Sequence, residues 1–378
     1  MKIYYWSPFF SNIATINAVI KSAESIIKYQ KKKEIEVSLI DAIGEWENYK
    51  NKINKKINII KLNRKNYINY IPKNSYIKSR ISYIFIFFLN FFKLTKLVNQ
   101  DKPDYLIIHL MTSLPIFLSF FFNKKTRIIL RISGLPKLNF FRYALWKIFS
   151  KKLYKVTCPT LGTFEYLKKL NIFDESKLVI LKDPVINVRR FANMKNELID
   201  EKFKKKKIIV AIGRLTKQKN FLFLVSSFFK IQKKFSDFDL VILGDGEEKQ
   251  EIKDLVLKLK ISEKVHLKGH EDNVFKYLIN SKYFILSSLW EDPGFVLIEA
   301  GISNTIILSS NCPNGPKEIV KNENFLYKTN DEDDLIKKFE IIENLEVREI
   351  YNQKLKIKKR LRAYTVFQHY QSLKKILI

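Results

Sequence analysis

The sequence predicts an α/β fold with two doubly wound parallel-sheet (Rossmann-like) domains that face a cleft. The chain has 378 residues, 46% of them apolar, and a single core seldom grows to that size. Short apolar runs alternate with longer helical patterns from end to end, which is typical of βαβ units. A polar stretch at residues 195–207, shortly after Pro184, separates the two halves.

The expected strands are short runs rich in β-branched and aromatic residues. In the first half they are residues 2–6, 35–40, 105–109, 127–132 and 155–159, and in the second half residues 206–212, 238–243, 264–268, 283–287 and 305–309. Residues 51–75 show little period, so no element is assigned there. The predicted domains are residues 1–190, completed by the C-terminal helix at about 360–378, and residues 203–359.

The charge is strongly basic and unevenly distributed. Lys and Arg outnumber Asp and Glu by 36 to 14 in residues 1–200 and by 33 to 24 beyond. Such an excess attracts nucleic acid, an anionic membrane surface or phosphorylated small molecules. Part of it can also reflect a composition rich in Lys, Ile and Asn throughout.

Cysteine usage and the first residues favour the cytoplasm. Cys158 and Cys312 are too few for a disulfide framework or a cysteine-based zinc site. The start, MKIYYWSPFF, lacks the features of a signal peptide.

Two apolar stretches invite a membrane reading. Residues 83–92 are too short to span a bilayer, and residues 106–122 fit a strand, a loop and the start of a helix better. No transmembrane helix is therefore expected. Residues 75–98 interleave apolar residues with Lys78, Arg80, Lys93 and Lys96, which suits either a surface lying on anionic lipid or a core helix with solvated ends.

Three motifs follow strands of the second half, where ligands collect in open parallel sheets. The first is the segment from Ala211 to Asn220, in which Gly213 permits a close turn while Arg214 and Lys219 lie where a diphosphate meets a helix N-terminus. The second is the turn Leu243-Gly-Asp-Gly246, where Gly244 serves the turn itself or the close approach of a nucleotide.

The third motif runs from Ser287 to Glu299. Pro293 fits the first turn of a helix, so Glu291 would precede that helix and Glu299 would lie about two turns inside it. The free N–H groups near Gly294 and Phe295 would face a phosphate or sugar oxygen. A carboxylate at Glu299 follows an apolar run and needs a partner, for which vicinal ribose hydroxyls would serve.

These segments, in this order and spacing, resemble the donor domain of the retaining GT-B glycosyltransferases of family 4. Glu291 and Glu299 reproduce the family's E-x7-E pattern, Gly213, Arg214 and Lys219 its G-R-x4-K pattern, and residues 310–318 its S-x-C-x-x-G-P-x-E segment. The resemblance covers residues 207–320. In the first half it is limited to the layout and to His109, similar to a strand-end histidine near the donor sugar.

The resemblance implies a role for each matching residue. Arg214 and Lys219 would bind the diphosphate of a nucleotide-sugar donor, Glu299 the ribose, and Glu291 the transferred sugar, with His109 touching that sugar from the first domain. Cations and helix N-termini would stabilise the leaving group, so no metal and no other cofactor is expected. The implied donor is a UDP-sugar, and the implied acceptor is a saccharide or lipid-linked saccharide of an envelope polymer. The enzyme would then act in the cytoplasm, at the inner face of the membrane.

Two departures from the family pattern concern the loops. Residues 8–15 carry no glycine where many members have a glycine-rich loop after the first strand, and Asp292 and Pro293 replace a glycine and an aromatic residue. Arg131, at a strand end, is a further candidate acceptor or phosphate contact. Glu318, at the start of a helix, suits a structural or a functional role equally.

The sequence offers little support for a metal site or for a nucleic-acid-binding protein. His266, His270 and His369 form no metal pattern, and the Asp-x-Asp spacings at 237–239 and 331–333 fit a metal motif only by accident. A nucleic-acid-binding protein would explain the charge, but no zinc spacing, RNP-like segment or base-reading basic helix supports it, so no nucleic acid is expected as a partner. A GT-B phosphorylase or epimerase would bind similar ligands.

Overall fold

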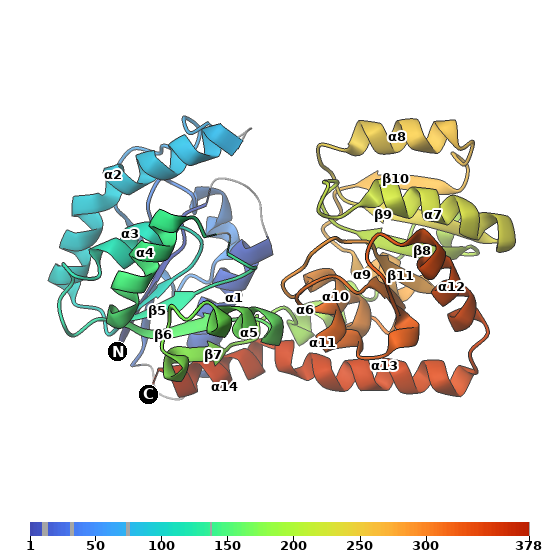
Figure 1. Ribbon diagram of the computed structural model, residues 1–378. Helices are drawn as coiled ribbons and strands as arrows, with labels where there is room; N and C mark the ends of the chain where they lie inside the picture. Colours follow the sequence, from blue (N-terminus) through green and yellow to red (C-terminus); the bar gives the residue numbers. More distant parts are fainter. Residues whose placement is uncertain (10–13, 31–33, 73–75, 137, 378) are drawn as a thin grey trace. The chain divides into compact units, whose positions relative to one another are not determined.

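A computed structural model describes residues 1–9, 14–30, 34–72, 76–136 and 138–377. They form two compact units (Figure 1): unit 1 comprises Met1–Pro184 with Val366–Ile378, and unit 2 comprises Val185–Thr365. The predicted boundary, at 190–203, lies a few residues later than the observed one. The C-terminal return to the first unit begins at Val366, within the predicted 360–378.

Unit 1 is built on a seven-stranded parallel sheet of order β3-β2-β1-β4-β5-β6-β7. Its strands are β1 (Lys2–Trp6), β2 (Glu36–Asp41), β3 (Asn58–Lys61), β4 (Tyr105–Ile108), β5 (Arg127–Arg131), β6 (Leu153–Cys158) and β7 (Leu178–Ile180). Its helices are α1 (Ala14–Tyr29), α2 (Tyr76–Asp101), α3 (Ser113–Leu118), α4 (Phe140–Phe149), α5 (Leu161–Lys169) and α14 (Val366–Ile376).

Two apolar layers cover the two faces of this sheet. One joins the sheet to α2, α3, α4 and α5, and the other joins it to α1 and α14. The crossover from β3 to β4 runs back across β2 and β1, which moves α2 and its successors to the face opposite α1. The C-terminal helix therefore packs beside α1 (Figure 1).

Unit 2 has a six-stranded parallel sheet of order β10-β9-β8-β11-β12-β13. The strands are β8 (Lys207–Ile212), β9 (Phe238–Leu243), β10 (Val265–Gly269), β11 (Tyr283–Leu286), β12 (Ile306–Ser310) and β13 (Leu326–Tyr327). The helices are α6 (Val188–Met194), α7 (Phe221–Lys234), α8 (Lys249–Lys258), α9 (Phe275–Ile279), α10 (Phe295–Ile302), α11 (Pro316–Val320), α12 (Glu332–Glu343) and α13 (Val347–Leu361).

The ten predicted strands are all present, with ends that differ by at most two residues. The sequence did not indicate β3, β7 and β13. Each of these lies at an edge of its sheet and has two to four residues. Short edge strands need little apolar sequence, which explains why their signal is weak.

Helix α2 is longer than the apolar run that the sequence suggested. The ten-residue run 83–92 lies inside a helix of 26 residues that continues through Lys93 and Lys96 to Asp101. Among the described residues, α2 is the one helix whose length and composition would suffice to cross a membrane, over Arg80–Asp101. Its inner face packs on the sheet through Ile86, Leu94 and Val98, all fully buried.

Candidate functional site

The candidate site lies at the carboxyl ends of the central strands of unit 2. The strand order reverses between β8 and β11, and ligands of doubly wound sheets bind at such a reversal. All three motifs singled out from the sequence belong to loops that follow β8, β9 and β11. A fourth loop, residues 311–315 after β12, joins them.

The loops after β8 and β9 pack backbone against backbone. Gly213 N–H donates to Leu243 O at 3.0 Å, and Leu215 N–H donates to Asp245 O at 2.9 Å. A Cβ at Gly244, whose φ is +141°, would lie 1.8 Å from Gly213 O. Gly244 is therefore required for the packing of the two loops, which is the structural one of the two roles considered for it.

Lys219 and Glu291 meet although they are 72 residues apart in sequence. Lys219 Nζ donates to Glu291 Oε1, and Ser288 Oγ donates to the same oxygen at 2.6 Å. The two charged side chains are only 14% and 6% exposed. A Cβ at Gly213 would lie 3.1 Å from Lys219 Cγ, so the G-R-x4-K and E-x7-E motifs form one contact cluster.

The main chain fixes this cluster as well. Ser287 Oγ donates to Lys219 O at 2.7 Å, and Leu289 N–H donates to Gln218 O at 2.8 Å. Glu291 N–H donates to Pro313 O at 3.1 Å, which ties the loop after β11 to the loop after β12. The ammonium of Lys219 is thus held in place before any ligand binds.

Arg214 differs from Lys219 in its surroundings. It follows Gly213 on the same loop, but its side chain is exposed, whereas that of Lys219 is largely buried. An exposed guanidinium is available to an incoming anion, and its planar fork suits two phosphate oxygens.

Helix α10 starts later than predicted. Gly294 is its N-cap, with φ +87°, and the helix begins at Phe295, so Pro293 precedes the helix instead of opening it. The left-handed conformation of Gly294 places Pro293 outside the helix. Glu299 is consequently the fifth residue of α10, about 6 Å along its axis, not two turns inside. Its side chain is partly exposed, as is that of Phe295.

The loop after β12 supports the start of α10. A Cβ at Gly315, with φ +128°, would lie 2.0 Å from Pro293 O, and Ser310 Oγ donates to Ser288 O at 2.7 Å.

Burial raises the pKa of the Cys312 thiol to about 12, so this thiol stays neutral and is no nucleophile. Glu318 lies in α11 and is partly exposed.

His109, the candidate from unit 1, is buried at the end of β4. Its side chain is 7% exposed, and its backbone N–H donates to Trp6 O at 2.7 Å. Burial lowers the pKa of His109 well below its ordinary value, with further contributions from Arg131 and His369. Its Nδ1 is buried and has no hydrogen-bond partner within the described part of the chain.

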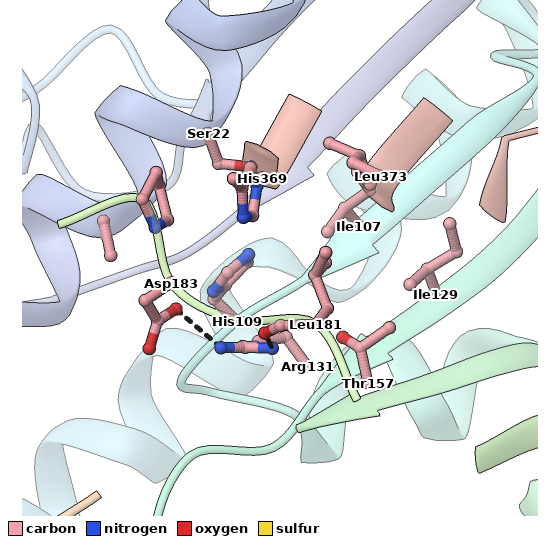
Figure 2. A pocket seen from close by; sticks show the side chains of 12 residues that line it. Ser22, Ile107, His109, Ile129, Arg131, Thr157, Leu181, Asp183, His369 and Leu373 are labelled. Atoms are coloured by element: carbon pink, nitrogen blue, oxygen red, sulfur yellow. Dashed lines mark hydrogen bonds and ion pairs between the residues drawn. The ribbon is translucent and has the colours of Figure 1, made fainter. Parts of the chain in front are cut away.

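Figure 2 shows the polar cluster around His109. Arg131 is 4% exposed, and its guanidinium donates to Leu181 O and to Asp183 Oδ1, both at 2.6 Å. These side chains line a cavity of about 10 Å³, which is room for roughly one water. Arg131, considered above as an acceptor or phosphate contact, is committed to Asp183 and Leu181 instead.

His369, to which sequence reasoning gave no role, joins α14 to the rest of unit 1. Its Nδ1–H donates to Lys182 O at 2.7 Å, and its Nε2 is 2.8 Å from Ser22 Oγ, which in turn is 3.1 Å from the hydroxyl of Tyr5. Burial lowers the pKa of His369 to about 4, so the ring is neutral. The signal in the sequence was its place among the buried positions Val366, Tyr370 and Leu373 of one helix face.

The candidate metal motifs have other contacts. Asp239 is in β9 and pairs with Lys206, Lys264 and His266, while Asp331 caps α12 by accepting from Asp334 N–H. In the part of the chain that the structure describes, no group of three or more His, Cys, Asp or Glu side chains is placed to hold a metal ion. Residues 10–13 of the glycine-free loop lie outside the described residues.

The fold is that of the GT-B glycosyltransferases. The whole chain aligns with a glycosyltransferase from Rickettsia africae ESF-5, at 16% identity and a TM-score of 0.77 over 97% of that chain. It likewise aligns with Anabaena Alr3699/HepE in complex with UDP, at 11% identity and a TM-score of 0.74 over 99% of that chain.

The sequence of unit 2 resembles that of known glycosyltransferases. Residues 193–362 match the family described as glycosyl transferases group 1. This match agrees with the glycosyltransferase resemblance inferred from the motifs, while the narrower assignment to family 4 stays a prediction.

Two curated relatives agree with that family. An uncharacterised glycosyltransferase of Methanocaldococcus jannaschii is 30% identical over 61% of this chain and 61% of its own length. A Campylobacter jejuni protein, N-acetylgalactosamine-N,N'-diacetylbacillosaminyl-diphospho-undecaprenol 4-alpha-N-acetylgalactosaminyltransferase, is 25% identical over 69% of this chain and 70% of its own length. The aligned part therefore spans less than two thirds of the first relative.

Proposed function

We propose that this protein is a retaining glycosyltransferase that moves a sugar from a UDP-sugar to a saccharide or lipid-linked saccharide during envelope polysaccharide synthesis, at the inner face of the membrane. The observation that carries the proposal is the cluster of Gly213, Lys219 and Glu291 at the strand-order reversal of unit 2. The group 1 family match over residues 193–362 supports the reaction class. The names of the relatives support the kind of acceptor.

In this proposal Lys219 and Arg214 bind the donor diphosphate. An ammonium has three N–H donors, and Glu291 accepts one of them. The remaining donors, the exposed guanidinium of Arg214 and the free N–H groups at the start of α10 then face the two phosphates. These groups offset the charge that develops on the departing UDP, and electrostatic stabilisation of this kind is usually the largest single contribution to catalysis.

Glu291 and Glu299 address different parts of the donor. Glu291 lies before α10 and its carboxylate holds Lys219, while Glu299 lies one turn inside α10. In this proposal Glu291 is on the sugar side, and Glu299 accepts hydrogen bonds from the ribose hydroxyls. The incoming hydroxyl attacks C1 from the face that the phosphate leaves, and its proton passes to a phosphate oxygen. The glycosidic bond forms as the C1–O bond to UDP breaks, with retention of configuration.

A transfer assay tests the proposal. The full-length protein is screened for thermal stabilisation by sugar nucleotides, and the stabilising donor is then incubated with short lipid-linked saccharides. We expect UDP and a UDP-sugar to stabilise the protein and NMR of the product to show a retained anomeric configuration. An inverted product would overturn the mechanism, and release of sugar 1-phosphate or an epimerised donor would reveal a phosphorylase or an epimerase.

The same assay tests the absence of a metal requirement. Because Arg214, Lys219 and the α10 N-terminus supply the positive field, turnover should be the same after treatment with EDTA. Activity that is lost in EDTA and returns with magnesium or manganese would contradict this assignment of the cations.

A further inference from the structure

One face of helix α2 in unit 1 is apolar and exposed to solvent. Five residues at helical spacing form this stripe, and each is exposed by 41 to 80%: Ile81, Ile84, Phe85, Phe88 and Phe92. Because a helix turns 100° per residue, they lie within one narrow sector. An exposed row of large apolar side chains marks a surface that binds something.

The opposite face of α2 is fixed on the protein. Five residues of this opposite face are fully buried: Ser82, Ile86, Asn90, Leu94 and Val98. Ser82 Oγ donates to Pro72 O at 2.8 Å, and Asn63 Nδ2 donates to Asn90 Oδ1 at 2.9 Å. A helix held along one side in this way cannot pass through a bilayer without breaking these contacts, although its length would allow it. It is placed to lie flat on a surface.

Aromatic contacts extend the stripe to α3 and α4. Phe117 of α3 packs against Phe91 of α2 and Phe149 of α4, with ring centroids 6.0 and 5.5 Å apart. Phe120, after α3, packs against Phe149 at 4.9 Å and is itself 51% exposed. The exposed residues of α2 and of the segment after α3 therefore belong to neighbouring elements.

The start of α4 adds two more exposed rings. Phe140 and Phe141 are 80% and 79% exposed. Helix α4, which these rings open, packs against α3, and α3 packs against α2. The name α2–α4 apolar surface is used below for the exposed apolar residues of these elements: Ile81, Ile84, Phe85, Phe88 and Phe92 of α2, Phe120 and Phe121 after α3, and Phe140 and Phe141 of α4.

The chain segment that contains this surface is strongly basic. Residues 48–164 contain 23 Lys and Arg but only two acids, Asp101 and Asp104. Cations that flank apolar side chains attract anionic lipid headgroups, each contributing about 1 kcal/mol near the surface. A second copy of the chain would bring two such basic surfaces together, and like charges repel. Nucleic acid would gain little from Ile81 and Ile84.

A cavity beside the stripe is also apolar. It measures about 350 Å³ and is lined by Tyr67, Ile71, Pro72, Ile81 and Phe85, among others. Ile81 and Phe85 belong to both the cavity and the stripe, so the cavity extends the apolar surface next to α2.

We infer that the α2–α4 apolar surface inserts its phenylalanine and isoleucine side chains into an anionic bilayer, with α2 parallel to the membrane plane. The inference deepens the proposed function and rests on it for one point, the lipid-linked acceptor, which is reached from that plane. An amphipathic helix in this position buries its apolar face at the boundary between headgroups and acyl chains.

Vesicle flotation of the full chain tests this inference, with vesicles of phosphatidylcholine alone or mixed with phosphatidylglycerol. We expect binding to the mixed vesicles, weakened by salt. The double variant Phe88→Ser with Phe92→Ser should bind at least about tenfold more weakly, because two apolar insertions are lost. The matched control is Val347→Ser with Tyr351→Ser on α13 of unit 2, residues that are 84% and 58% exposed, and it should bind like the wild type.

Three outcomes would overturn the inference: equal binding by the Phe88 and Phe92 variant, no binding of the wild type to mixed vesicles, or a dimer that this variant dissociates in the absence of lipid. Transfer to a water-soluble acceptor separates the two proposals. If the variant loses vesicle binding but keeps that transfer, the surface is confirmed with the function intact. A wild type that binds vesicles but transfers no sugar would refute the proposed function alone.

Discussion

Units 1 and 2 are both parallel sheets whose strand order reverses once, between β1 and β4 and between β8 and β11. In unit 2 the loops at the reversal touch through their backbones, and glycines at 244 and 315 leave no room for a side chain. In unit 1 the polar groups at the strand ends are the long side chains of His109 and Arg131, both buried, and Arg131 pairs with Asp183 from a distant segment. A site built from close backbone contacts therefore needs particular residues at fixed spacing, whereas a side-chain network does not.

The largest expected effect concerns the glycines. Gly244→Ala places a Cβ on the carbonyl of Gly213, so unit 2 should lose about 3 kcal/mol or more of unfolding free energy. Gly269→Ala is the control within unit 2, and Gly134→Ala is its counterpart in unit 1. Both have positive φ but nothing within 4 Å, so each should cost about 1 to 2 kcal/mol. Chemical denaturation measures all three, and equal losses would show that backbone packing does not distinguish the loops.

Glu291→Ala should lower turnover by about two decades, roughly 3 kcal/mol in activation free energy. In the proposed mechanism this variant loses the carboxylate that positions Lys219 and would face the sugar, but keeps the cations that would bind the diphosphate, so UDP affinity should change little. Ser288→Ala removes one hydrogen bond to Glu291 and should give a smaller loss. Steady-state kinetics together with UDP titration measure both, and ordinary turnover in the Glu291→Ala enzyme would refute its role.

The buried polar network around His369 should make the free energy of unfolding of unit 1 depend on pH. His369 has a folded pKa of about 4, below the ordinary 6.5, so the unfolded chain binds more protons between these values. The stability that this buried, neutral ring contributes is complete above pH 6.5 and declines as the pH falls toward 4. By pH 5 roughly 2 kcal/mol should be lost.

The partners of His369 are Ser22 and Lys182 O, with the charge of Arg131 nearby. His369→Gln should reduce the pH dependence of unfolding between pH 7 and 5, and His270→Gln, at a ring that is 80% exposed, should not. Identical pH profiles for the wild type and His369→Gln would contradict the buried neutral ring.

The smallest effect is expected at Glu299. Glu299→Gln keeps the shape of the side chain but loses the charge that strengthens hydrogen bonds to the ribose, so UDP should bind about tenfold more weakly, near 1.4 kcal/mol. Glu263→Gln, at an exposed position of unit 2, is the control. Calorimetric titration measures the affinity, and an unchanged Kd for UDP would remove Glu299 from the donor site.

The sequence by itself determined the fold class, ten of the strands and the segments that meet in the candidate donor site. Parallel strands are buried on both faces, so their apolar runs are visible without the structure, and the glycines and charges of residues 213–219 and 291–299 stand at spacings that backbone contact requires. Only the tertiary structure decided which groups meet. The pair Lys219–Glu291, the pairing of Arg131 with Asp183 and the docking of His369 on Ser22 each join positions far apart in the chain.

Two further points were also beyond the sequence. The start of α10 at Phe295 depends on the left-handed turn at Gly294 and on the packing of Gly315 against Pro293, which no local propensity specifies. Both faces of α2 carry large apolar residues, and the buried face also contains Ser82 and Asn90, so periodicity could not tell which stripe the sheet would bury. Burial is decided by contact with distant residues, and the sequence records those contacts only where backbone geometry or close packing restricts the choice of side chain.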